Sequence, residues 1–137
     1  MTRLRKVSAF GGICAIIFLS GQAAAVELTG AWVVTADQCK KVFVRKGRGH
    51  QVGFREFSGT YGGGFIVEAD RLRGKFANCV IKAKKEDGDT INLLAGCTTD
   101  IMLSNIQFVL KRVDEDNLTR LFPGIEGMEV HYHRCQI

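Results

Sequence analysis

The sequence predicts an all-β protein: a small antiparallel up-and-down barrel or strongly curved sheet, stapled by disulfides. Short segments rich in Val, Ile, Phe, Thr and Tyr recur between Gly, Asp and Asn residues, a pattern typical of strands joined by turns. No apolar stripe of helical period extends beyond two turns, which argues against a helical fold. Four cysteines follow an N-terminal segment typical of exported proteins. An even number of cysteines in an exported protein favours disulfides over metal ligation.

Residues 1–25 are expected to form a cleavable secretory signal peptide. They contain, in order, a basic start, an apolar run and small residues suited to a signal peptidase: residues 3–6, 9–19 and 23–25. The apolar run is shorter than the roughly 20 residues that cross a bilayer as a helix. Cys14 lies within this run rather than after it, which argues against lipid attachment. We therefore expect an exported protein, periplasmic or secreted, without a transmembrane segment.

Residues 26–137 are expected to form one all-β domain, since 112 residues suffice for one modest core. The pattern predicts ten strands, at residues 28–34, 41–44, 51–54, 64–68, 72–76, 79–84, 90–97, 106–112, 118–122 and 128–134. Hairpin turns are expected at 69–70, 87–89 and 114–117, and a loop or strand kink at 62–64. Helical turns are the alternative at 36–40 and 98–106.

The hairpin with its turn at 87–89 constrains the disulfide pairing. Its apolar residues fall on odd positions, namely Cys79, Ile81 and Ala83 on one strand and Ile91, Leu93, Ala95 and Cys97 on the other. If both sets face the core, opposed residues have numbers with an even sum, which excludes a two-residue loop and allows a three-residue one. Cys79 then lies opposite Cys97, and Cys39 remains for Cys135. Three pairings are possible in principle, and this register favours the one given.

The charges outside the signal peptide nearly balance, at 16 basic against 14 acidic residues, but they are segregated. Residues 26–85 hold 12 basic and 5 acidic residues, whereas residues 86–137 hold 4 and 9. Candidate anion-binding residues lie on one basic stretch: Arg45, Lys46, Arg48 and Arg55. Such a stretch suits an anionic surface polymer, a lipid headgroup or an acidic partner protein, while nucleic acid is a poor partner for an exported protein. The alternative is a solvated loop whose charges are neutralised by strands from the other half.

His131 and His133 are candidate metal ligands, because positions i and i+2 of a strand project from the same face. A zinc-type site needs a third ligand, for which Glu129 and His50 are candidates. The alternative is a pair of ordinary histidines on the solvent face of the last strand. No catalytic constellation is recognisable in the sequence, so we expect neither enzymatic activity nor a cofactor.

The first predicted strand contains Gly30 and Trp32 in a Gly-x-Trp motif, with the only tryptophan of the chain. This motif resembles the start of the lipocalin-like, or calycin, barrels. In that group the tryptophan plugs one end of an up-and-down barrel, and an arginine from the last strand packs over it. The resemblance assigns these roles to Trp32 and Arg134. The alternative is that Trp32 is simply a large core side chain and Gly30 a strand glycine that leaves room for it.

The resemblance implies a small exported protein that binds a ligand, which the sequence does not identify. The alternative is a periplasmic inhibitor of a protease or lysozyme that acts by protein–protein contact, since the group includes exported bacterial protease inhibitors with a similar motif. A carrier needs an apolar cavity of roughly a few hundred cubic ångströms, whereas an inhibitor presents a loop over a filled core. Phe108 and Leu110, two positions apart on a late strand, would line such a cavity if their face borders one.

Overall fold

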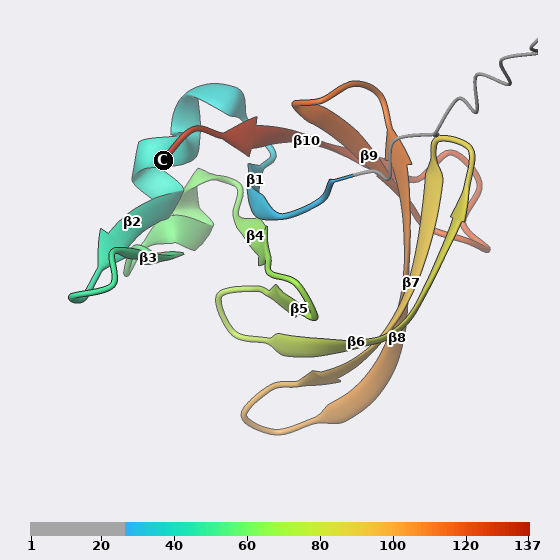
Figure 1. Cartoon of the computed structure of the whole chain (residues 1–137), viewed down its shortest axis with the longest axis horizontal. Coiled ribbons are helices and arrows are strands. Elements are labelled where there is room, and N and C mark those ends of the chain that lie inside the picture. Colours follow the sequence, from blue (N-terminus) through green and yellow to red (C-terminus); the bar gives the residue numbers. More distant parts are fainter. Residues whose placement is uncertain (1–26) are drawn as a thin grey trace, which may run out of the picture.

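The computed structural model describes residues 27–137, and the predicted signal peptide with Cys14 lies outside them. Ten strands and three short helices make up the described chain (Figure 1). In chain order they are β1 (Gly30–Val33), η1 (Ala36–Gln38), α1 (Cys39–Val42), β2 (Phe43–Lys46), β3 (Gln51–Phe54), η2 (Ser58–Tyr61), β4 (Gly64–Val67), β5 (Arg71–Arg73), β6 (Asn78–Asp87), β7 (Thr90–Thr98), β8 (Leu103–Arg112), β9 (Asn117–Leu121) and β10 (Glu129–Cys135). Each of the ten strands expected from the sequence is present.

Eight of these strands close an antiparallel barrel in the order β1, β10, β9, β8, β7, β6, β5, β4. β1 closes it by pairing with both β10 and β4, so that Trp32 lies opposite Arg134 on one side and opposite Phe65 on the other. Apart from the excursion between β1 and β4, consecutive strands are neighbours. The predicted antiparallel barrel is therefore confirmed, and its architecture is consistent with that of the calycin group.

The other two strands, β2 and β3, form a hairpin outside the barrel. Together with α1 it covers the outer face of β1 and β4 through a second apolar cluster that contains Ala31, Val33, Val42, Phe43 and Ile66. The strand expected at 41–44 begins only at Phe43, because the chain first turns through the helices that were the alternative at 36–40. A disulfide between Cys39 and Cys135, with Cα atoms 5.6 Å apart, fastens this covering layer to the last barrel strand, as predicted.

The β6–β7 hairpin places Cys79 opposite Cys97, and the two form the predicted disulfide with Cα atoms 3.9 Å apart. Its loop, however, holds two residues, 88–89, rather than the three expected. The cysteines are opposed despite the shorter loop because a β-bulge at Lys82 inserts an extra residue into β6 and changes the register. Side chains beyond the bulge are turned to the other face, so Ala83 is exposed instead of facing the core.

Gly64 begins β4 opposite Val33 of β1. A Cβ atom at this position would lie 2.3 Å from the carbonyl oxygen of Trp32, an approach that only glycine permits. The glycine-rich segment at 62–64 therefore leads directly into a barrel strand. The helical alternative at 98–106 is wrong, because β7 extends to residue 98 and β8 begins at residue 103.

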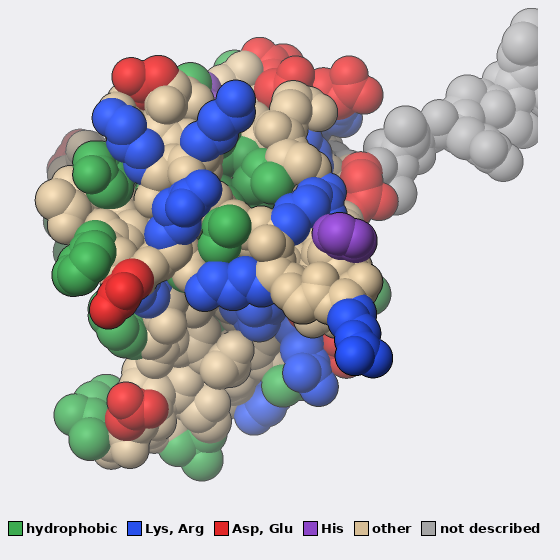
Figure 2. Space-filling model, turned by 90° about the vertical axis from the view of Figure 1, so that its left-hand side faces the viewer, with side chains coloured by type: hydrophobic (Ala, Val, Ile, Leu, Met, Phe, Trp, Pro, Cys, Tyr) green, Lys and Arg blue, Asp and Glu red, His purple; other side chains and the backbone are tan. Residues whose placement is uncertain are grey.

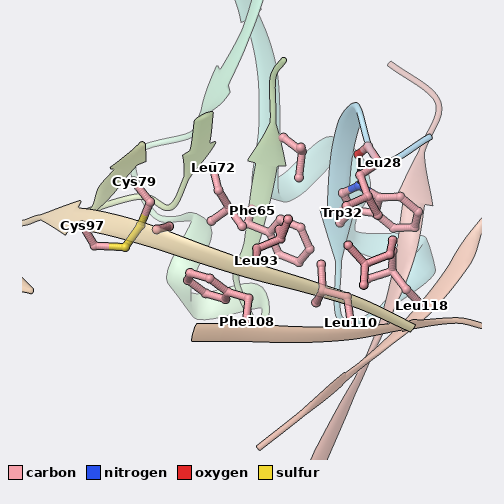
Figure 3. Close-up of a cluster of buried hydrophobic side chains, with 13 residues drawn as sticks. Leu28, Trp32, Phe65, Leu72, Cys79, Leu93, Cys97, Phe108, Leu110 and Leu118 are labelled. Carbon is pink, nitrogen blue, oxygen red and sulfur yellow. Dashed lines mark hydrogen bonds between the residues drawn. A yellow bond between two sulfur atoms is a disulfide. The ribbon is translucent and has the colours of Figure 1, made fainter. Parts of the chain in front are cut away.

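The barrel has two different ends, because neighbouring strands are antiparallel and successive links alternate between them. The tryptophan end contains the start of the described chain and three short links, residues 27–29, 68–70, 88–89 and 113–116. The loop end contains the segment before β4 and three further links, residues 55–63, 74–77, 99–102 and 122–128. The core fills the space between strands with large apolar side chains, from Trp32 with Leu28 and Leu118 to the Cys79–Cys97 disulfide (Figure 3).

Candidate functional site

The barrel interior retains a cavity of about 260 Å³. Its wall consists mainly of apolar side chains and glycines: Gly64, Phe65, Leu72, Gly74, Ala77, Cys79, Ile106, Phe108, Leu110, Arg120 and Tyr132. Gly64, Gly74 and Ala77 belong to the loop end, so the cavity lies toward that end of the barrel. Phe108 and Leu110 both line it, as the sequence led us to expect for a barrel with a cavity.

Arg120 is the one charged residue in the cavity wall. It lies in β9 opposite Leu110 of β8 and Val130 of β10, on the inward face that Leu118 also shares. The centre of its guanidinium lies 4.6 Å from the ring centroid of Phe108 and 4.6 Å from that of Phe122. Two aromatic rings therefore hold this cation in place at the cavity wall.

The Nε atom of Arg120 is buried and has no hydrogen-bond partner among the described residues. None of the ion pairs within residues 27–137 involves this guanidinium either. Leaving a buried donor of a charged group unsatisfied costs about 1–3 kcal/mol or more. A carboxylate in the cavity would relieve this cost, because a guanidinium presents a planar fork of donors that matches carboxylate geometry.

Tyr132 lines the cavity from β10, the strand next to that of Arg120. Its ring meets that of Phe65 edge-on, with centroids 4.8 Å apart and planes at 75°. Phe65 in turn stacks near Trp32, with centroids 6.4 Å apart. The aromatic wall is thus fixed by packing that continues into the core, which favours a preformed cavity over one that opens only with ligand.

The tryptophan end brings together the three residues singled out by the Gly-x-Trp resemblance. Trp32 is 1% exposed, and its Nε1 donates to the carbonyl oxygen of Leu28 at 2.9 Å. The guanidinium of Arg134 lies 4.3 Å from the indole centroid. Gly30 has a φ of +138°, and a Cβ atom there would lie 3.1 Å from Nη1 of Arg134. Glycine therefore leaves the space through which the arginine reaches across the indole.

Arg134 also bonds to backbone on both sides of the barrel end. It donates to the carbonyl oxygens of Thr29 at 2.5 Å, Glu27 at 2.8 Å and Glu115 at 3.0 Å. Asp116 adds an ion pair at 3.7 Å. One side chain thus fastens the start of the described chain to the β8–β9 link, which gives this end a structural role.

Two carboxylates at the tryptophan end have lowered pKa values. The pKa of Glu27 lies below its ordinary value of 4.5, mainly because of hydrogen bonding with Thr29 and also because of the Arg134 charge. The pKa of Asp114 lies below 3.8, mainly because the side-chain amide of Asn117 donates to its carboxylate at 2.8 and 2.9 Å. Both groups stay ionised to lower pH than free carboxyl groups.

The basic residues predicted to bind anions do not form one cluster. Arg45 donates to the backbone oxygens of His50 and Ile137. Lys46 donates to the carbonyl oxygen of Phe54 at 3.0 Å, and Arg55 donates to that of Lys40 at 2.5 Å. Arg48 is exposed in the β2–β3 turn. Figure 2 shows the face that carries α1 and this hairpin, with Lys and Arg side chains spread over its middle. Arg45 and Arg48 lie toward the hairpin tip, while Arg55 follows β3 at the loop end. Anion binding by this stretch stays a prediction, and its residues lie at two different places on the surface.

His131 and His133 lie on the same face of β10, as predicted, and both contact β9. Nδ1 of His131 lies 2.9 Å from Oγ1 of Thr119, and Nδ1 of His133 lies 2.6 Å from Oδ1 of Asn117. Nε2 of His131 lies 3.3 Å from the Glu129 carboxylate. Within residues 27–137 no group of three or more potential metal-ligating side chains comes together. Metal binding therefore stays a prediction without a third ligand in this part of the chain.

Sequence reasoning missed Arg120, although the signal was present. Leu118, Arg120 and Phe122 alternate in sequence, so the expected strand at 118–122 places an arginine on the same face as two apolar residues. An inward-facing arginine on a strand of a small barrel is unusual enough to mark a site, since charged side chains mostly face solvent.

No helix among residues 27–137 is long and apolar enough to cross a membrane. The two disulfides fit an oxidising environment. No protein-family model, curated protein or solved structure matches the chain, so its likeness to the calycin group rests on barrel architecture and on the packing of Arg134 over Trp32.

Proposed function

We propose that this protein is an exported, non-enzymatic binding protein that holds a small amphipathic anion in its barrel. The apolar body of the ligand would occupy the cavity, and its carboxylate would pair with Arg120. The observation that carries this proposal is the buried, unpartnered Nε of Arg120 in an otherwise apolar wall. Export is supported by the N-terminal sequence pattern and by the two disulfides.

The size of the cavity restricts the ligand. A volume of about 260 Å³ accommodates about nine non-hydrogen atoms, at the roughly 30 Å³ that a water molecule occupies in the liquid. This is close to the lower limit of typical small-molecule sites. Medium-chain carboxylates and small aryl carboxylates fit such a space, whereas long-chain lipids would extend through the opening at the loop end.

The charge of Arg120 selects among ligands of that size. Uncharged alcohols gain the apolar contacts but leave the positive charge at Arg120 without a counter-charge, and alkylamines add repulsion. Carboxylates gain the apolar contacts and a charge-assisted hydrogen bond. We therefore expect heptanoate to bind at least about tenfold more tightly than 1-heptanol, a preference that corresponds to roughly 1.4 kcal/mol.

Calorimetric titration with heptanoate and 1-heptanol tests the proposal. Arg120→Leu should abolish the preference for the carboxylate while leaving binding of the alcohol within about threefold. Lys111→Leu is the matched control, since it removes one positive charge from an exposed position on β8, next to cavity-lining Leu110 in sequence. Loss of the preference in the Lys111 variant as well would mean that general charge, not Arg120, attracts the anion.

Phe108→Ala tests whether the cavity itself is the binding site. Because Phe108 borders empty space, its truncation should change heptanoate affinity and cost well below about 3 kcal/mol of unfolding free energy. A filled core would give a large loss of stability and no effect on any ligand. That result, with no carboxylate bound by the parent protein, would contradict the proposal and favour the inhibitor alternative.

A further inference from the structure

The loop end carries most of the exposed apolar side chains of the described residues. Of twelve exposed large hydrophobic residues, eight lie on its links or at their junctions with strands: Phe57, Tyr61, Phe76, Ile101, Met102, Leu103, Ile125 and Met128. Exposure reaches 89% for Ile101, 79% for Leu103 and 77% for Phe76. Single exposed hydrophobic residues are ordinary, but their concentration on all four links of one end indicates an interaction surface.

Basic side chains accompany these apolar residues. Arg55, directly after β3, donates through Nε to the carbonyl oxygen of Lys40 in α1 at 2.5 Å. Nζ of Lys75, in the β5–β6 link, donates to the carbonyl oxygen of Arg55 at 2.7 Å. These bonds join three separate segments at the loop end and gather Lys40, Lys41, Arg55 and Lys75 on one side of it.

Two of these lysines lie over exposed aromatic rings. The Lys41 ammonium is 5.1 Å from the ring centroid of Tyr61, and that of Lys75 is 5.7 Å from the ring centroid of Phe76. A surface hollow of about 380 Å³ lies between Lys40, Lys41, Arg55, Glu56, Phe57 and Tyr61. Aromatic rings and long basic side chains side by side are the composition that suits a boundary between apolar and aqueous phases.

The acidic side chains are distributed in the opposite way. The links of the tryptophan end contain no basic residue and seven acidic ones: Glu27, Glu68, Asp70, Asp89, Asp114, Glu115 and Asp116. The loop-end links contain three, Glu56, Asp100 and Glu126. An anionic surface would therefore attract the lysine-bearing side of the loop end and repel the tryptophan end.

We propose that the loop end docks on an anionic phospholipid bilayer. The exposed side chains of Phe76, Ile101, Met102 and Leu103 would enter the interfacial region, and the cluster of Lys40, Lys41, Arg55 and Lys75 would contact headgroup phosphates. The charge complementarity of the loop end selects an anionic bilayer over a neutral one. Docking in this orientation turns the cavity toward the lipid, so that a ligand can pass between the two without crossing water.

Flotation with lipid vesicles tests the docking surface directly. The protein is purified after export and its N-terminus is determined, and all variants carry that same N-terminus. We expect it to float with vesicles that contain phosphatidylglycerol at low salt. It should float far less with pure phosphatidylcholine vesicles, or with the anionic vesicles in about 0.5 M salt, which screens surface charge. Failure to float with anionic vesicles would overturn the proposal.

Two variant pairs locate the contact. The triple variant Ile101→Ser, Met102→Ser, Leu103→Ser should reduce partitioning by on the order of tenfold or more, because three exposed apolar side chains are lost. Leu94→Ser with Val113→Ser is the matched control, since these side chains are 44% and 62% exposed on β7 and in the β8–β9 link at the tryptophan end, outside the loop-end links. Equal losses in the two variants would overturn the assignment to the loop end.

Lys40→Gln with Lys41→Gln should weaken binding to anionic vesicles by about 25-fold, at about fivefold for each lysine near an anionic surface. The same variant should bind neutral vesicles as the parent does. Arg120→Leu should float like the parent, so that docking and ligand binding fail or succeed separately. Intact disulfides and an unchanged circular dichroism spectrum verify that each variant is folded, and parental flotation of the lysine variant would contradict the headgroup contact.

Discussion

The two ends of the barrel use an arginine stacked on aromatic rings in opposite ways. At the tryptophan end, Arg134 covers Trp32 and donates to three backbone carbonyl oxygens. Toward the loop end, Arg120 lies between Phe108 and Phe122, and its Nε has no partner among the described residues. The comparison teaches that hydrogen bonds to backbone make one guanidinium a structural element of its end, while the other retains an unsatisfied donor, on which the proposed anion site rests.

The surroundings of the two arginines differ in the same sense. The tryptophan end has short links that carry acidic residues. The loop end has links of equal or greater length that carry exposed apolar side chains. Stability should therefore depend mainly on the tryptophan end, and binding mainly on the loop end. Variants matched between the two ends can break or sharpen this division.

The largest difference is expected between Trp32→Ala and Phe108→Ala. Trp32 is 1% exposed and fills the core, so its truncation should lower the free energy of unfolding by about 3–5 kcal/mol. Phe108 borders the cavity and should cost well below about 3 kcal/mol. Chemical denaturation measures both values. Equal losses would show that the loop end is packed as firmly as the tryptophan end.

The two arginines themselves provide the second comparison. Arg134→Leu removes charge-assisted hydrogen bonds to three carbonyl oxygens and should cost about 2–3 kcal/mol. Arg120→Leu removes an unsatisfied Nε donor together with two cation–π contacts, and because these effects on stability oppose each other, the change should be less than about 1 kcal/mol in either direction. Thermal unfolding of both variants, without added ligand, measures the contrast. A large loss on replacing Arg120 would mean that it has a structural partner.

A smaller difference is expected between two glycines. Gly30→Ala meets both a φ of +138° and the Arg134 guanidinium at 3.1 Å, and should cost about 1–3 kcal/mol. Gly124→Ala, in the β9–β10 link, meets a φ of +88° in open space and should cost about 1 kcal/mol. Denaturation midpoints of the two variants measure these losses of stability. Equal losses would show that the Arg134 side chain moves aside for a Cβ atom at position 30 at little cost.

The smallest expected effect is a titration. Because the pKa of Glu27 is lowered in the folded protein, its contribution to stability is present above about pH 4.5 and is lost as the pH falls through the folded pKa. Two-dimensional NMR of the Glu27 side chain should give a pKa below 4.5 in the parent protein. The value should move toward 4.5 in Arg134→Leu, although Thr29 remains the larger cause. An unchanged pKa would mean that the charge of Arg134 does not affect the Glu27 carboxylate.

The sequence by itself predicted the strands, favoured the observed cysteine pairs and, through the Gly-x-Trp resemblance, pointed to the packing of Arg134 over Trp32. Alternation with period two identifies strands without knowledge of their partners, because it reflects only which side chains can share a face. The same parity placed Cys79 opposite Cys97 and left Cys39 for Cys135, and both disulfides are present. Trp32 and Arg134 meet because they lie on the first and last strands, which pair when an up-and-down sheet closes.

Only the tertiary structure decided how these strands are distributed between barrel, covering layer and cavity wall. The hairpin of β2 and β3 has the alternation of a barrel strand pair, yet it lies outside, because the outer face of β1 and β4 is also apolar. The bulge at Lys82 leaves Ala83 exposed, since parity alone does not reveal an inserted residue. Alternation in the sequence predicts that Arg120 faces inward. The sequence does not predict that its Nε lacks a hydrogen-bond partner, because the residues around it come together only in the closed barrel.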